Sequence, residues 1–164
     1  MRTDPAEEVT STNPWGSTRR AEAEVLLAGG VVVRGEVHTQ ALSPHHEGPE
    51  SVEEFLNRDQ LFFALTQADG GVLFVAKAQA AVVSCAPEGD PVDPARASVA
   101  KLLRLEVTLR DGTEIAGSTS VELPPTRARA IDFLNLPEPF FTLWDEVRTR
   151  HVNRAWIRIV RPLE

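Results

Sequence analysis

The sequence contains an internal repeat, and this repeat limits the fold more than any other feature. Three blocks in the N-terminal part match three blocks in the C-terminal part, in the same order. The matched pairs are 23–37 with 105–119, 51–65 with 129–143, and 75–83 with 152–160. Their offsets of 82, 78 and 77 residues differ only through the lengths of loops. Such ordered self-similarity indicates that one structural unit was duplicated.

The second matched pair carries the closest identity. Residues 51–65 read SVEEFLNRDQLFFAL, and residues 129–143 read RAIDFLNLPEPFFTL. We expect positions shared by both copies to serve the common fold, and positions found in one copy only to be freer to serve a function. By this criterion we interpret as structural the pairs Gly35 and Gly117, Asn57 and Asn135, and the repeated phenylalanines.

The repeat divides the chain into four segments. We expect residues 1–20 to be a flexible polar tail and residues 87–100, with three prolines and three acidic residues, to be a linker. The first half is residues 21–86, and the second half is residues 101–164. A unit of about 60 residues buries too little apolar surface to be stable alone. We therefore expect the two halves to pack together as an internal pseudo-dimer.

Each half is predicted to be mostly β-structure. Leu105, Val107 and Leu109 alternate with polar residues, and a period of two is typical of a half-buried strand. Turns follow at Gly29–Gly30 and at Asp111–Gly112, where both central positions of a tight hairpin favour positive φ. The sequence therefore predicts one hairpin at the start of each half.

A short helix is predicted after the hairpin, with the sequence VEEFLN in the first half and AIDFLN in the second. Asn57 and Asn135 are expected to end these helices in the left-handed conformation, which asparagine tolerates. Three more short strands complete each half. The predicted fold class is thus β-rich, between all-β and α+β, with two tandem small barrels that each carry one short helix.

The hairpin V-x-L-x-[DG]-G-x-x-x-x-G and the final I-x-[IV]-V resemble the small barrels of the Sm-like and SH3-like kind. The doubled FLN–FF pattern resembles an uncharacterised bacterial family of tandem small domains, which implies a fold and no activity. Sm proteins hold an RNA base with a loop that contains Asp and Asn, together with an Arg-Gly near the last hairpin. Neither element is present in this sequence, so the resemblance carries no expectation of RNA binding.

Composition excludes several classes of protein. The net charge of −7 argues against a general nucleic-acid binder. No apolar run approaches 18 residues, so no membrane span is expected. The acidic, polar N-terminus does not resemble a secretory signal. The single cysteine, Cys85, excludes an internal disulfide and is expected to be a small core residue. We therefore expect a soluble, cytoplasmic, bacterial-looking protein.

Enzyme chemistry finds little support in the sequence. There is neither a G-x-S-x-G nucleophile turn nor a phosphate-binding glycine loop. His38, His45 and His46 lie in or near the segment SPHHEGPE, but neighbours in an irregular loop are not preoriented as metal ligands. We expect no catalytic residue, no cofactor and no metal site. The alternative, an unrecognised hydrolase, would require a deep polar pocket between the halves.

Charge differs between the halves and suggests where a partner could bind. The first half carries nine acidic and three basic residues, a net charge of −6, and the second half carries ten basic and nine acidic residues, a net charge of +1. Basic residues cluster near the C-terminus at Arg148, Arg150, Arg154, Arg158 and Arg161. This cluster either binds a carboxylate-rich or phosphate-bearing partner or forms a solvated strand face.

The three tryptophans have no aromatic match in the other half. Trp156 is predicted to lie on the last strand and to point outward beside Arg158, a combination common at protein interfaces. The alternative is that Trp156 covers the junction between the halves. The candidate partner-binding residues are therefore Trp144, Arg148, Arg150, Arg154, Trp156, Arg158 and, in the tail, Trp15.

These observations favour a non-enzymatic protein-interaction or assembly module, an adaptor or scaffold subunit whose partner is another protein. The alternative is an Sm-like protein that binds RNA or a phosphate ligand, with Arg148, Arg150 and Arg154 at the phosphates. Nucleic acid is not the expected partner, no membrane is expected, and self-association stays open.

Overall fold

The computed structural model describes residues 18–87 and 101–163. Residues 1–17 of the predicted tail, with Trp15, and most of the predicted linker therefore lie outside the described residues. The strands are β1 (Thr18–Leu27), β2 (Val32–Gln40), β3 (Phe62–Thr66), β4 (Val72–Ala76), β5 (Ala80–Cys85), β6 (Lys101–Leu109), β7 (Glu114–Val121), β8 (Phe140–Trp144), β9 (Thr149–Asn153) and β10 (Ile157–Leu163). The α-helices are α2 (Val52–Leu56) and α4 (Ala130–Leu134), and the 3-10 helices are η1 (Ala28–Gly30), η2 (Lys77–Gln79), η3 (Pro125–Arg127) and η4 (Arg154–Trp156).

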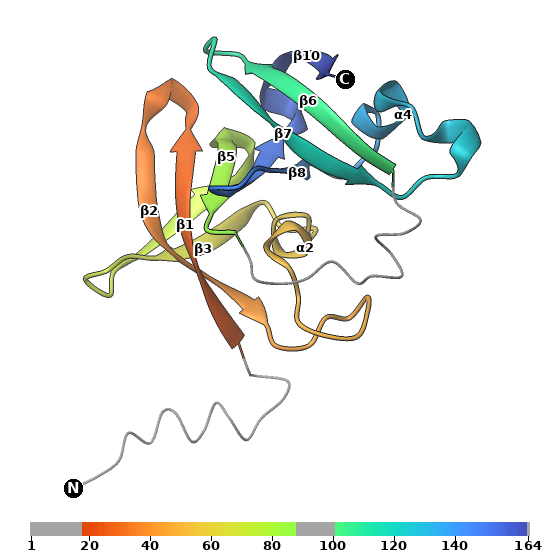
Figure 1. Cartoon of the computed structure of the whole chain (residues 1–164). Helices are drawn as coiled ribbons and strands as arrows, with labels where there is room; N and C mark the ends of the chain where they lie inside the picture. Colours follow the sequence, from red (N-terminus) through yellow and green to blue (C-terminus); the bar gives the residue numbers. More distant parts are fainter. Residues whose placement is uncertain (1–17, 88–100, 164) are drawn as a thin grey trace, which may run out of the picture.

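All ten strands of the described residues form one antiparallel sheet in the order β10-β6-β7-β8-β9-β5-β1-β2-β3-β4 (Figure 1). The prediction of a β-rich protein is confirmed. The sheet ends at β10 on one side and at β4 on the other, and it does not close into a barrel. The tandem closed barrels expected from the sequence are therefore not confirmed.

The two halves place their strands in the same order. The fifth strand of each half pairs with the first, and the first, second, third and fourth then follow side by side. The register of the hairpin also agrees. Ala23 faces Gly35 in the first half, and their counterparts Leu105 and Gly117, each 82 residues later in the chain, face each other in the second half. The halves join where β5 pairs with β9. The first strand starts at Thr18, three residues before the predicted start of the first half.

The predicted hairpin turns are present, with one difference. Gly29 and Gly30 both have a φ of 80°, and Gly112 has a φ of 90°. The expectation that Asp111 has a positive φ is wrong, because only glycines have a positive φ among the described residues. The carboxylate of Asp111 instead accepts a hydrogen bond of 2.9 Å from the backbone N–H of Thr113. This side-chain bond holds the turn without a left-handed residue at that position.

The two predicted helices form, and each is stabilised at its first turn. Ser51 caps α2, since its hydroxyl accepts from the backbone N–H of Glu54 and the carboxylate of Glu54 accepts from the backbone N–H of Ser51. In α4, the carboxylate of Asp132 accepts from the backbone N–H and the guanidinium of Arg129. In the described parts of the chain, neither helix is long and apolar enough to cross a membrane.

Both helices end differently from the prediction. Asn57 has a φ of −90° and Asn135 a φ of −91°, so the predicted left-handed conformation is wrong. The side chain of Asn57 donates a hydrogen bond to the carbonyl of Phe140 in the second half, and that of Asn135 donates to the carbonyl of Ile131 in its own helix. The side chain of asparagine, rather than its tolerance of positive φ, is therefore what these positions use.

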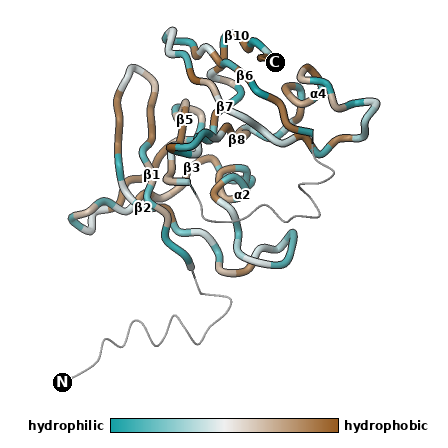
Figure 2. The backbone as a smooth tube through the Cα atoms, in the orientation of Figure 1, coloured by the Kyte–Doolittle hydropathy of each residue, from teal (hydrophilic) through white to brown (hydrophobic). Residues whose placement is uncertain are grey.

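The apolar residues form two core clusters, one for each half, and the clusters exchange members. Phe140 of the second half belongs to the first cluster, whereas Ala81 and Val82 of the first half belong to the second. Apolar stretches run along the strands, while the connection after β2 is largely hydrophilic (Figure 2). Each cluster contains an edge-to-face aromatic pair, with centroids 5.9 Å apart for Phe55 and Phe63 in the first. Cys85 is buried in the first cluster, as expected.

Candidate interaction surface

The contact between the halves, which we call the seam, is formed by β5 and α2 on one side and by β8 and β9 on the other. Strand β5 pairs with β9 from Val82 opposite Val152 to Cys85 opposite Thr149, and α2 packs against β8. The buried side chain of Asn153 donates to the carbonyls of Lys77 and Ala80, at 3.1 and 3.0 Å. The two halves are thus held together at the seam by backbone pairing and by side-chain hydrogen bonds.

Asn57 makes two hydrogen bonds to one residue across the seam. Its amide donates to the carbonyl of Phe140 at 3.0 Å, and its carbonyl oxygen accepts from the Phe140 backbone N–H at 2.8 Å. Phe140 is 1% exposed. The counterpart Asn135 donates to Ile131 of its own helix at 2.9 Å, and Phe62, the counterpart of Phe140, is 55% exposed. The same motif is therefore satisfied across the seam in one half and left open in the other.

This difference predicts unequal costs for the same substitution. We expect Asn57→Ala to lower the free energy of unfolding by about 2 kcal/mol, because two hydrogen bonds to a buried strand are lost. Asn135→Ala is expected to cost less than about 1 kcal/mol, because its bond lies within an exposed helix end. Urea denaturation of both variants measures the two values. Equal losses would show that Asn57 acts only as a helix end and not as a link across the seam.

A partly buried chain of polar side chains also crosses the seam. The hydroxyl of Thr142 lies 2.5 Å from a carboxylate oxygen of Glu53 and 2.8 Å from Nδ1 of His151. Burial raises the pKa of Glu53, although the hydrogen bond from Thr142 and the charge of Arg154 lower it in part. Burial lowers the pKa of His151 to about 4, and its Nε2 has no hydrogen-bond partner among residues 18–87 and 101–163.

The direction of these hydrogen bonds follows from the charge on Glu53. When the carboxylate is ionised, it accepts the hydroxyl proton of Thr142, and the Thr142 oxygen then accepts from Nδ1–H of His151. This arrangement leaves Nε2 as a bare acceptor. The polar chain of Glu53, Thr142 and His151 does not open onto either cavity described below, because none of these three residues lines a cavity. Its contacts therefore indicate a role in joining the halves.

Arg154, a candidate partner-binding residue, is largely occupied inside its own half. Its guanidinium donates to the carbonyls of Phe133, Leu134 and Glu138 and lies 4.9 Å from the ring centroid of Phe141. Its counterpart Lys77 likewise donates to the carbonyl of Arg58, beyond the end of the other helix, at 2.8 Å. Both residues start a 3-10 helix. Their shared contacts fix the end of the preceding α-helix.

The other arginines of the predicted cluster also have partners in the chain. Arg150 donates to Asp145 at 2.8 Å. The backbone N–H of Arg148 accounts for the largest share of the fall in the pKa of Asp145 to about 2, and Arg150 adds to it. The remaining contacts join Arg148 to Glu24, Arg158 to the carbonyl of Arg110, and Arg161 to Glu106. The cluster is therefore a set of paired guanidinium groups.

The two tryptophans of the second half lie at different places. The prediction that Trp156 lies on the last strand is wrong: Trp156 ends η4, and β10 begins at Ile157. Its indole N–H donates to the carbonyl of Ala78 in the first half at 2.8 Å, and the guanidinium of Arg110 lies 4.7 Å from its ring. Trp156 is thus placed at the seam, which is the second of the two positions considered for it. Trp144 ends β8 and is partly buried.

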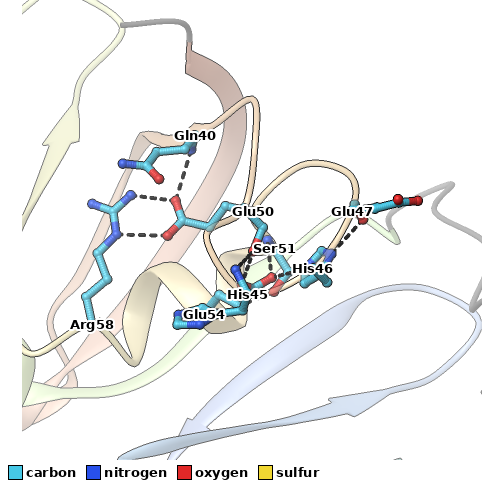
Figure 3. A network of polar contacts seen from close by, with 9 residues as sticks. Gln40, His45, His46, Glu47, Glu50, Ser51, Glu54 and Arg58 are labelled. Carbon is cyan, nitrogen blue, oxygen red and sulfur yellow. Dashed lines mark hydrogen bonds and ion pairs between the residues drawn. The ribbon is translucent and has the colours of Figure 1, made fainter. Parts of the chain in front are cut away.

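The histidine loop is held by a network of polar contacts (Figure 3). The buried carboxylate of Glu50 accepts from the backbone N–H of Gln40 and from the guanidinium of Arg58. His46 lies within hydrogen-bond distance of the carbonyl of Glu47 and of the carboxylate of Glu54. Within residues 18–87 and 101–163, no three His, Cys, Asp or Glu side chains gather so as to hold a metal ion.

The larger cavity, about 740 Å³, lies between β1, β2, the end of β5 and the turn after β8. Its charged lining residues are Glu22, Glu24, Arg34, Glu36 and Arg148. Glu24 accepts from Arg34 at 2.9 Å and lies 4.0 Å from Arg148. No histidine is among its lining residues, so no nucleophile–imidazole pair of the kind that a hydrolase uses is assembled there.

An exposed apolar surface lies at the end of the sheet that β3 and β4 form. Phe62 faces Ala76, Ala64 faces Phe74 and Thr66 faces Val72, so these six side chains share one side of the strand pair. Phe62, Val72 and Phe74 are exposed, the last at 76%, and Leu61 beside them is also exposed. We call the surface formed by Leu61, Phe62, Val72 and Phe74 the β3–β4 face. A second cavity, about 370 Å³, opens beside Leu61 and Phe62.

The β3–β4 face was not predicted from the sequence. The criterion that set aside shared residues removed Phe62, because its counterpart Phe140 is also phenylalanine. A usable signal was nevertheless present, since the run VLFVA over 72–76 is apolar at every position and so makes both sides of an edge strand apolar. Such a strand is expected either to be covered or to bind a partner.

Comparisons with known proteins place no further constraint on this surface. No protein-family model, curated protein or solved structure matches the chain.

Proposed function

We propose that this chain is a non-enzymatic protein-interaction or assembly module, and that it binds its partner through the β3–β4 face. The observation that carries the proposal is the exposure of Leu61, Phe62, Val72 and Phe74 on one strand pair at the open end of the sheet. Contiguous apolar patches of this kind on a folded protein mark sites of interaction. Two phenylalanines supply the aromatic anchors that dominate binding energy at interfaces.

The backbone of β4 adds a second element to this surface. In the described residues, β4 pairs only with β3, so its outer backbone groups can pair with a strand of a partner. Backbone pairing gives affinity, and the apolar side chains give register and specificity. The proposed partner is therefore a protein that presents an exposed strand with apolar neighbours.

The alternative of RNA or phosphate binding receives less support. It relied on Arg148, Arg150 and Arg154, and each of these guanidinium groups already contacts a carboxylate or backbone carbonyls. Phosphate recognition by arginine needs free N–H groups arranged as a fork. The net charge of −7 also opposes binding to a polyanion.

We also propose that the two halves are duplicates of one small unit, packed as an internal pseudo-dimer, and that this unit is related to the Sm-like or SH3-like barrels that its hairpin resembles. The shared strand order and hairpin register support the duplication. The matched roles of Lys77 and Arg154 at the helix ends support it independently.

The proposed docking surface is tested by Phe74→Asp. A charge at this exposed position is expected to change stability by no more than about 0.5 kcal/mol and to abolish binding of the partner. Leu102→Asp is the matched control, because Leu102 is similarly exposed but lies on β6. Quantitative affinity capture should recover the same partners with the wild type and the control and lose them with Phe74→Asp. Unchanged recovery with Phe74→Asp would contradict the proposed surface.

A further inference from the structure

We propose that the partner at the β3–β4 face is a second copy of this chain, docked head to tail, so that β10 and α4 of one copy contact β3 and β4 of the next. This inference rests on the proposed function and names the partner. The seam supplies the pattern, because in the seam the fifth strand and the helix of one half contact the third and fourth strands of the other.

Among the described residues of a single chain, neither side of such a contact is paired on its outer edge. Strand β10 is the counterpart of β5, and β4 is the counterpart of β9. In the described residues, β10 pairs only with β6 and β4 pairs only with β3. The two open ends of the sheet therefore carry the two sides of a second seam, which another copy can complete.

The asparagine contact of the seam can be repeated without any change of residue. Across the seam, Asn57 makes two hydrogen bonds to the backbone of Phe140. The counterparts at the open ends are Asn135 and Phe62, and both are identical to the residues that they replace. Phe62 is exposed, although its counterpart is almost fully buried by the seam. A second copy that brings Asn135 to Phe62 would bury that ring in the same way.

At the two open ends of the sheet, the residues that correspond to the polar chain of the seam are apolar on both surfaces. Ile131 stands where Glu53 stands, and Ala64 and Phe74 stand where Thr142 and His151 stand. His151 is 3% exposed, whereas Phe74 is 76% exposed. In a head-to-tail contact Ile131 would meet Ala64 and Phe74, so apolar faces apolar where the seam has polar facing polar. A change on one surface that is matched on the other indicates that the two surfaces bind each other.

The two ends also match in position and in charge. Ile159, exposed on β10, is the counterpart of Val82, which pairs with Val152 in the seam. The first half has a net charge of −6 and the second half +1, so unlike halves attract more than like halves. Pro162 stands at the place of Cys85 and has no N–H, which limits the new strand pairing to the residues before it. We therefore expect a reversible, concentration-dependent contact.

Because the two surfaces differ, the contact is heterologous. Repeated head-to-tail contacts produce a ring if the rotation between copies closes, and a filament if it does not. Either outcome leaves every β3–β4 face covered except at the end of an open filament. The exposed apolar residues of the β3–β4 face are thereby accounted for.

Two variants that each block one end test this proposal in the full-length chain. Phe74→Asp blocks the β3–β4 face and leaves the β10–α4 end intact, whereas Ile131→Asp does the reverse. Both residues are exposed, so folding is expected to be retained and is checked by circular dichroism. By sedimentation velocity we expect the wild type and the control Leu102→Asp to exceed the monomer mass of 18.0 kDa. Each blocked variant alone should be a monomer.

The decisive sample is the equimolar mixture of the two blocked variants. One intact surface on each variant allows a single contact, so the mixture should form a dimer of twice the monomer mass. If Ile131→Asp alone still dimerises, two β3–β4 faces bind each other and the head-to-tail arrangement is wrong. If the wild type stays monomeric at all concentrations, the second copy is not the partner, and capture of a different protein through Phe74 would then leave the proposed function standing.

Discussion

The free energy of unfolding should fall by about 3 kcal/mol as the pH drops from 6.5 towards 4, because His151 is buried in its neutral form. Its pKa in the folded chain is about 4, against 6.5 when the imidazole is exposed. In this interval the unfolded chain takes up a proton at His151 and the folded chain does not, so stability is lost as the pH falls. The magnitude follows from about 1.4 kcal/mol for each unit of pKa difference.

Other groups near the seam shape the lower part of this profile. Burial raises the pKa of Glu53, so the folded chain protonates it first, and this contributes stability as the pH falls towards its unfolded pKa. Protonation of Glu53 therefore offsets part of the stability that is lost through His151, but only in the lower part of the pH interval. In the upper part, the change in the free energy of unfolding depends mainly on His151. Arg154 keeps its charge throughout and therefore adds no slope of its own.

Chemical denaturation at a series of pH values measures this profile. His151→Gln has no titrating ring, so its stability should be nearly constant over the upper part of the interval. His38→Gln is the matched control, because His38 is exposed on β2, and this variant should retain the wild-type slope. A wild-type slope in His151→Gln would show that another group causes the loss.

Gly35→Ala should also cost about 3 kcal/mol, because a side chain there meets backbone. A Cβ at Gly35 would lie 2.5 Å from the carbonyl oxygen of Thr66 and 2.9 Å from the side chain of Leu65. Neither atom is the end of a flexible side chain, so the hairpin and β3 must separate, and overpacking of this kind costs about 1–3 kcal/mol or more. Gly117→Ala should be similarly harmful, because its Cβ would lie 2.9 Å from the carbonyl oxygen of Trp144.

The control for these glycines is Gly71→Ala. Its Cβ would approach the side chain of Asp69 at 3.1 Å, and that carboxylate can move at little cost. We expect a loss below about 1 kcal/mol, and thermal unfolding of all three variants gives the order. A result in which Gly35→Ala is as stable as Gly71→Ala would mean that β2 does not pass as close to β3 as the structure has it.

Local features of the fold were predictable from the sequence. The alternation at Leu105, Val107 and Leu109, the glycines of the turns and the two FLN segments mark strands, turns and helices at the right places. Each of these signals depends on neighbouring residues. The bond of Asn57 to Phe140, 83 residues away, could not be predicted, because the neighbouring residues do not distinguish Asn57 from Asn135, which bonds within its own helix.

The candidate surface could not be predicted in the same way. Sequence pattern does not show which strand of one half pairs with which strand of the other, since nothing in the apolar β5 or in the mostly polar β9 (TRHVN) identifies its neighbour. Without the β5–β9 contact, Phe62 and Phe140 look alike, although one is exposed and the other buried. The arginines were likewise named as candidate partner-binding residues because the carbonyls that Arg154 contacts carry no signal in the sequence.

Amide hydrogen exchange of the full-length chain at low and high protein concentration tests the central claim most directly. If the two open ends of the sheet bind each other, the amides of Val72–Ala76 in β4 and of Ile157–Arg161 in β10 should exchange more slowly at high concentration. The amides of β5, already paired in the seam, should not change. Protection that is absent at both ends, or that appears at β4 without β10, would contradict a head-to-tail contact between copies.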